Sequence, residues 1–107
     1  MNQKNKIEKS WGYEGLFISE DKYAAKILII KEGESTSYLY NKIREKTVYV
    51  LQGIVIVTLD DSSSLLNEGD RKHIPPKTKH KLPAIKGDAT IIEVGTKLED
   101  DEIILEA

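Results

Sequence analysis

The sequence contains no cysteine, one tryptophan, one phenylalanine and three prolines in 107 residues. The absence of cysteine excludes disulfides, thiolate nucleophiles and zinc or iron–sulfur sites built on cysteine, and it fits a reducing compartment. Only two histidines are present, so imidazole is available at His73 and His80 alone. Any metal or acid/base chemistry must therefore rest on these two rings, on carboxylates and on lysines.

The chain also lacks an excess of one charge and an apolar run long enough to cross a membrane. Sixteen basic and eighteen acidic residues leave a net charge of −2, and composition alone names no partner. The first ten residues are polar and carry Lys4, Lys6 and Lys9, so they predict neither a signal peptide nor a membrane span. We expect one domain, residues 1–107, in the cytoplasm and without a membrane partner.

Charge is distributed unevenly along the chain. Five lysines or arginines and both histidines lie between Arg71 and Lys81, whereas residues 99–106 are acidic. A basic loop can attract phosphate-bearing ligands through its local potential, but a solvated loop has the same composition. The loop has no interleaved aromatic residues and the chain is slightly acidic overall, so we do not expect nucleic-acid binding.

Short segments rich in β-branched and aromatic residues alternate with turn residues, which is typical of an all-β sandwich or barrel. Turns are expected at Gly53 and at residues 86–88. Residues 39–46 tolerate a helical turn, but we assign them to a loop. The expected strands cover residues 14–19, 23–31, 35–41, 47–52, 54–59, 63–66, 72–74, 80–84, 89–94 and 102–105.

The segment from Gly69 to His80 predicts a turn, a short strand, a corner and an inward-facing histidine. Pro75 and Pro76 have no backbone donor, so they must lie at a corner or a sheet edge. This spacing resembles the second conserved motif of the cupins. Further segments that resemble the same family, in the same order, are residues 9–14, 23–28, 33–37, 47–53, 92–95 and 98–101.

Taken together, these segments resemble a small single-domain cupin over nearly the whole chain. The resemblance is closer to the cupin unit of type II mannose-6-phosphate isomerases and to the C-terminal domain of bifunctional mannose-1-phosphate guanylyltransferases. It implies an all-β fold, a cupin β-barrel or jelly roll of two antiparallel sheets.

The resemblance also places four seats that hold metal ligands in relatives that bind a metal. They fall on Leu39, Asn41, Lys46 and His80 of this chain. A leucine has no lone pair, a lysine is normally a cation and an asparagine offers a weak neutral oxygen, whereas such sites need imidazole or carboxylate. We therefore expect no tightly bound metal and no other cofactor.

Strand alternation predicts which side chains face inward. Lys46, Val48 and Val50 share one face, as do Leu39 and Asn41 on an earlier strand. Lys46 would then project a positive charge toward the volume that a cation occupies in relatives. If Lys46 is buried, desolvation favours its neutral form, which could act as a base. Alternatively, its long stem could carry the ammonium group to the barrel mouth.

A metal site rebuilt from other residues is the alternative, with His73, His80, Glu45 and Glu93 as donors. Glu45 is next to the inward Lys46 and should face away, and the orientation of His73 is left open. His80 itself fits two roles, a surviving base or ligand and a histidine held by hydrogen bonds in the packing.

Two further features bear on a ligand cavity. Lys26 shares a face with apolar neighbours, so it needs a buried partner, and we expect Glu93 to be that partner. Trp11 and Tyr13 fit either the mouth of a ligand cavity or the plug of one barrel end.

Three functional hypotheses follow. The first is a metal-free cupin that binds a small anionic, sugar-like ligand, such as a sugar or sugar phosphate. The second is an isomerase or epimerase that works by side-chain acid/base chemistry. The third is a homodimeric interaction module whose Tyr38, Tyr40 and Tyr49 form an exposed patch on adjoining strands. The predicted catalytic residues are His80 and Lys46, and the predicted substrate-binding residues are Lys26, Asn41, His73, Trp11 and Glu93.

Overall fold

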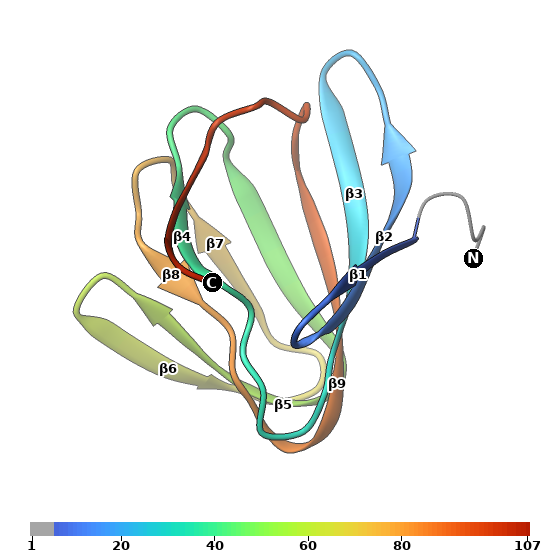
Figure 1. The fold of residues 1–107 in the computed structure, drawn as a ribbon, viewed down its shortest axis with the longest axis vertical. Coiled ribbons are helices and arrows are strands. Elements are labelled where there is room, and N and C mark those ends of the chain that lie inside the picture. Colours follow the sequence, from blue (N-terminus) through green and yellow to red (C-terminus); the bar gives the residue numbers. More distant parts are fainter. Residues whose placement is uncertain (1–5) are drawn as a thin grey trace.

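The computed structural model describes residues 6–107, and this part of the chain forms strands and loops without a helix (Figure 1). The described residues accordingly include no helix with the length and apolar character needed to span a membrane. The strands are β1 (Lys6–Lys9), β2 (Gly12–Ser19), β3 (Tyr23–Ile30), β4 (Tyr38–Asn41), β5 (Lys46–Leu59), β6 (Ser62–Leu66), β7 (Arg71–Ile74), β8 (His80–Lys81), β9 (Ala84–Thr96) and β10 (Glu102–Glu106).

All strands belong to one antiparallel sheet in the order β1-β2-β3-β9-β5-β8-β4-β10, with β6 and β7 paired to β5. The sheet curls into an open cup (Figure 1). The predicted all-β fold class is confirmed. The two expected sheets are hydrogen-bonded into one, because the long strands β5 and β9 bend and run through both halves.

Gly53 bends a strand rather than ending it, which corrects the predicted turn. It has a φ of 90°, and the register between β5 and β9 shifts on both sides of it. A Cβ at this position would lie 2.7 Å from the carbonyl oxygen of Asp88, so only glycine fits. The predicted turn at residues 86–88 likewise lies within β9. Both are bulges, which insert a residue and increase bending without breaking the strand.

The inner face of the cup has an apolar part and a charged part. Alternation along β5 buries Val48, Val50, Val55 and Val57, which pack with Ile91 of β9 in the core. Toward the start of β5 the inner face becomes charged. The strand register places this charged region, described below, directly next to the core.

The corner predicted at Pro75 and Pro76 lies after β7, as expected. The Lys77 amide, which follows the two prolines, donates to the carbonyl of Asn41 at 2.6 Å. Lys77 itself has a φ of 65°, which turns the chain back toward the sheet. The turn brings His80 to the start of β8, opposite Leu39 of β4.

Candidate functional site

A cavity of about 60 Å³ lies on the inner face of the cup, at the charged end of the core. It lies between strands that are far apart in the sequence, from β1 to β10. Five of the seven predicted site residues line it: Trp11, Lys26, Lys46, His80 and Glu93. The structure therefore brings most of the predicted residues to one place.

Lys46 faces the interior, as alternation predicted. Its side chain is 6% exposed, and its Nζ forms an ion pair with Oε1 of Glu93 at 3.4 Å. Gly95 allows this approach, because a Cβ there would lie 2.4 Å from the Glu45 carbonyl oxygen and 2.9 Å from the Cβ of Lys46. Because Gly95 has no side chain, the first residues of β5 can lie close to β9, the strand that also carries Glu93.

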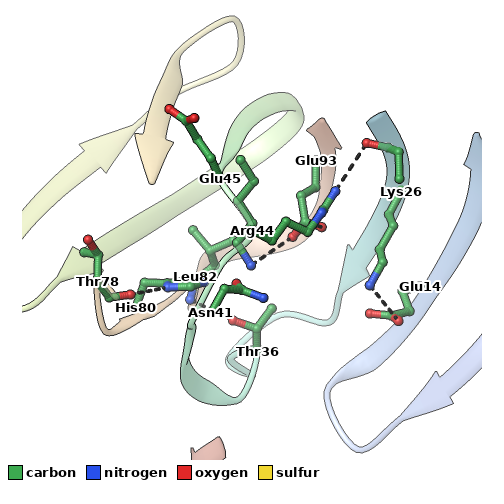
Figure 2. Close-up of polar contacts among 12 residues, drawn as sticks. Glu14, Lys26, Thr36, Asn41, Arg44, Glu45, Thr78, His80, Leu82 and Glu93 are labelled. Carbon is green, nitrogen blue, oxygen red and sulfur yellow. Dashed lines mark hydrogen bonds and ion pairs between the residues drawn. The ribbon is translucent and has the colours of Figure 1, made fainter. Parts of the chain in front are cut away.

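Arg44 is the main residue that sequence reasoning missed. It is buried, and its Nη1 donates to Oε2 of Glu93 at 2.8 Å. Its Nε donates to the carbonyl of Thr96 and its Nη2 to the carbonyl of Ala24, so three of its donors are used within the protein. Figure 2 shows the guanidinium next to Glu93. Arg44 lies two residues before Lys46, in the loop that precedes β5, so strand alternation did not predict its orientation.

Glu93 is the centre of the buried charges. Burial alone would raise the pKa of its carboxyl group. The charges of Lys46, Lys26 and Arg44, with the hydrogen bond from Arg44, outweigh burial and lower the pKa to about 2. Glu93 is therefore ionised at neutral pH, and it shares one negative charge between two directly paired cations.

Lys26 has a different partner from the expected one. It lies directly opposite Glu93 in the register of β3 and β9, but its Nζ pairs with Oε1 of Glu14 on β2 at 3.4 Å (Figure 2). Both side chains of this pair are 15% exposed. Glu93 is already engaged by Arg44 and Lys46, and Glu14 is the carboxylate left for Lys26. The charge of Lys26 nonetheless acts on Glu93.

His80 is buried on the opposite wall of the cavity. Its Nδ1 donates to the carbonyl of Thr78 at 2.8 Å, which leaves the lone pair on Nε2 (Figure 2). Burial and the nearby charge of Lys46 lower the pKa of His80 to about 4, although Thr78, Glu93 and Asp60 act in the opposite direction. The ring is therefore neutral near pH 7, and Nε2 is a hydrogen-bond acceptor.

Asn41 does not line this cavity, which corrects its expected placement. Its Nδ2 donates to Oδ1 of Asp101 at 3.0 Å, and it borders a neighbouring cavity with Arg44 and Asp101. Its own Oδ1 is buried without a hydrogen-bond partner among residues 6–107. Asp101 also accepts from the backbone amides of Ile43 and Arg44 at 2.8 and 2.7 Å, so it fastens the loop that carries Arg44.

His73, which was predicted as a substrate-binding residue, does not lie in the cavity either. It lies opposite Thr47 on the outer face of the sheet, where its Nε2 contacts Oε2 of Glu45. Both side chains are about half exposed. Glu45 faces away from the cavity, as predicted. The set of His73, His80, Glu45 and Glu93 is thus divided between two faces of the sheet and cannot surround one ion.

The residues of the cavity do not fit a divalent metal. At the four seats implied by the family, Leu39 presents an alkyl group, Asn41 turns to Asp101 and Lys46 presents an ammonium group. His80 alone keeps a donor atom that suits zinc or manganese. Within residues 6–107, no group of three or more His, Cys, Asp or Glu side chains lies close enough together to hold an ion.

Trp11 combines the two roles considered for it. It lies in the turn between β1 and β2, it is 5% exposed, and it belongs to the hydrophobic core while also forming part of the cavity wall. Its carbonyl accepts a hydrogen bond from the amide of Lys31 at 2.9 Å. The indole therefore gives the cavity one apolar, well-fixed wall.

The predicted tyrosine patch is not formed on adjoining strands. Tyr38 and Tyr40 lie on β4, which pairs with β8 and β10, whereas Tyr49 lies on β5. Moreover, β5 meets β8 only near Thr58, while Tyr49 pairs with residues of β7 and β9. The strand β8 separates the two groups of tyrosines.

Similarity to solved structures defines the class of fold. A cupin-2 domain from Rhodospirillum rubrum aligns with a TM-score of 0.78 at 13% identity, covering 86% of this chain and 64% of that chain. The capsular polysaccharide assembling protein CapF from Staphylococcus aureus aligns with a TM-score of 0.84 at 17% identity, covering 95% and 34%. The chain has a cupin fold, as the resemblance implied.

Comparison of the sequence assigns the chain to one family within this class of fold. The family described as mannose-6-phosphate isomerase C-terminal matches residues 1–106, and the chain belongs to this family. A relative, the mannose-1-phosphate guanylyltransferase of Escherichia coli K12, is 28% identical over 101 residues, which are 92% of this chain and 21% of that enzyme. The chain therefore spans about a fifth of this relative.

Proposed function

We propose that the chain binds a small anionic, sugar-like ligand in the inner cavity and does so without a bound metal ion. Lys46 supplies the positive charge, His80 supplies a hydrogen-bond acceptor, and Trp11 supplies an apolar wall. The family of isomerase domains and the relative named for mannose 1-phosphate support a sugar-like ligand.

The observation that carries the proposal is the unbalanced charge at Glu93. Arg44 and Lys46 both pair with this single carboxylate, so the buried group of three has one net positive charge. A buried charge without a counter-ion is costly. A ligand anion that approaches Lys46 would balance it, and this gain is available only inside the cavity.

Binding is better supported than proton transfer. A general base works best when its pKa lies near the working pH, whereas the pKa of His80 is about 4. Such a ring is a weak base at pH 7 but a good acceptor for a hydroxyl group. Nζ of Lys46 is already engaged in an ion pair with Oε1 of Glu93 at 3.4 Å.

Thermal unfolding of the purified chain with sugar acids and sugar phosphates tests this proposal. A ligand that binds only the folded state raises the midpoint temperature. We expect the rise to disappear in Lys46→Met and to persist in Lys42→Met, a control at an exposed neighbouring lysine. The proposal fails if none of these anions raises the midpoint, or if the rise is unchanged in Lys46→Met.

The expected homodimer remains a prediction. A sizing column with light scattering would measure the oligomeric state directly. Because β8 separates Tyr49 from Tyr38 and Tyr40, a substitution at Tyr49 alone does not test one common tyrosine surface.

A further inference from the structure

We infer that the anionic group of the ligand is a carboxylate on a small hydroxylated carbon frame, and not a phosphate. This inference rests on the proposed function, which requires an anion at Lys46 but leaves its chemistry open. Charge, donor geometry and volume around the cavity each bear on the choice.

The charge around the cavity matches a single negative charge. The pair of Lys26 and Glu14 is neutral, and Lys9 and Glu102 at the rim carry opposite charges. The net positive charge next to the cavity is therefore the single one left by Arg44, Lys46 and Glu93. A carboxylate brings one negative charge. A phosphate monoester brings about −2 at neutral pH, and its second charge would have no counter-ion in this buried place.

The free donors also match a carboxylate. The guanidinium of Arg44 is directed to Glu93 and to two backbone carbonyls, and Arg44 does not line the cavity. Lys26 is engaged by Glu14. Lys46 has three N–H donors and pairs within the described residues only with Glu93, so two donors remain for the two oxygens of a carboxylate. A phosphate monoester presents three strong acceptor oxygens.

The cavity lacks the groups that proteins commonly use for phosphate. Helix N-termini, nests of backbone amides and arginine forks are the usual phosphate sites. The described part of the chain has no helix, and the residues that line this cavity include neither an arginine nor a glycine. Lys46 is the buried lysine of this cavity that is not paired with Glu14, whereas Lys9 lies exposed at the rim.

The remaining walls suit hydroxyl groups on a short carbon frame. Nε2 of His80 accepts a hydrogen bond, the hydroxyl of Ser37 lines the same cavity, and Trp11 gives an apolar surface. The cavity of about 60 Å³ accommodates a small group such as a carboxylate and the carbon that carries it, and a longer frame would extend to the rim between Lys9 and Glu102.

Ligands that share a carbon frame and differ only in the charged group test the inference. Titration calorimetry of the full chain at pH 7.5 and constant ionic strength would compare mannuronate, mannose 6-phosphate and mannose, and then glycerate, glycerol phosphate and glycerol. We expect the carboxylate of at least one set to bind ten-fold or more tightly than its phosphate counterpart, and the neutral compounds to bind most weakly.

The pH dependence and one variant sharpen the test. A phosphate monoester loses its second charge near pH 6, whereas a carboxylate stays singly charged, so the preference for carboxylate should shrink between pH 7.5 and pH 5.5. Lys46→Arg places a fork of donors at the same position and should shift the preference toward phosphate. Lys42→Met, a control at an exposed lysine, should leave the ratio of affinities unchanged.

The outcomes separate the inference from the proposal on which it rests. Equal or tighter binding of the phosphate in both sets overturns the carboxylate inference but leaves an anion site at Lys46. If neither anion of either set binds, the proposed function itself fails, and the inference fails with it.

Discussion

The two faces of the sheet at the start of β5 carry similar groups in different surroundings. On the outer face, His73 and Glu45 contact each other with both side chains about half exposed to solvent. On the inner face, His80, Lys46 and Glu93 are almost fully buried. Lys46 and Glu45 are adjacent in the sequence, so one residue of strand alternation separates the two environments.

This difference shows that burial decides what these residues can do. Water and salt screen an exposed pair, and such a pair typically contributes less than about 1 kcal/mol to stability. Buried charges interact strongly and cannot be left unpaired. The inner face can therefore hold a neutral histidine next to an ammonium group, whereas the outer pair remains an ordinary surface contact.

Replacing the central carboxylate should have the largest effect. Glu93→Gln leaves Arg44 and Lys46 buried without their common counter-ion, and we expect a loss of about 3 to 5 kcal/mol in the free energy of unfolding. The matched change Glu45→Gln on the outer face should cost less than about 1 kcal/mol. Urea denaturation at pH 7.5 measures both, and similar losses for the two variants would contradict the comparison.

Acidification should have the next largest effect, through His80. The pKa of His80 is about 4 in the folded chain and about 6.5 when unfolded. The unfolded state therefore takes up the proton first as pH falls, and stability present above pH 6.5 is lost progressively down to pH 4. We expect a loss of about 2 to 3 kcal/mol over this range from His80.

A variant at His80 isolates this contribution. His80→Asn should flatten the dependence of unfolding free energy on pH between 6.5 and 4.5. Below pH 4.5 the protonation of Glu93 adds a further loss, because its folded pKa of about 2 lies below its ordinary value of 4.5. An unchanged slope in His80→Asn would refute this assignment.

A smaller effect is expected at the loop that carries Arg44. Asp101 accepts three hydrogen bonds, two of them from the backbone amides of Ile43 and Arg44. Asp101→Asn removes the charge from these bonds and should cost about 1.5 to 3 kcal/mol. Asp100→Asn at the exposed neighbouring residue is the control and should be nearly neutral. Equal unfolding midpoints in the two variants would show that Asp101 does not fasten the loop.

The fold was largely predictable because its signals are local. Alternation identified the strands and the inward position of Lys46, and the two prolines identified the corner before His80. The turns predicted at Gly53 and at residues 86–88 were wrong, because glycine permits both a turn and a bulge. Which of the two forms depends on the strand that lies opposite.

The candidate site was predictable only in part. Lys26, Glu93 and Trp11 line the cavity. Strand parity and apolar neighbours indicated the inward face of Lys26, and the need of a buried lysine for a counter-ion indicated Glu93. For Trp11 the sequence left the cavity mouth and a plug of the barrel end as alternatives. Arg44 was not predicted as a site residue because it lies in a loop, where strand alternation does not apply. The orientation of His73 near a strand end was not fixed by the sequence pattern, and its outer position follows from pairing with Thr47.

The sequence by itself determined the all-β character of the chain, the inward lysine at position 46 and the change of three of the four family ligand seats, because periodicity and residue type are local properties. Only the tertiary structure decided that Arg44 shares Glu93 with Lys46 and that Lys26 pairs with Glu14. These pairings join residues up to 49 positions apart, so they depend on strand register and loop path. The same long-range packing removes water from His80 and leaves His73 exposed, and it thereby gives two identical side chains different chemistry.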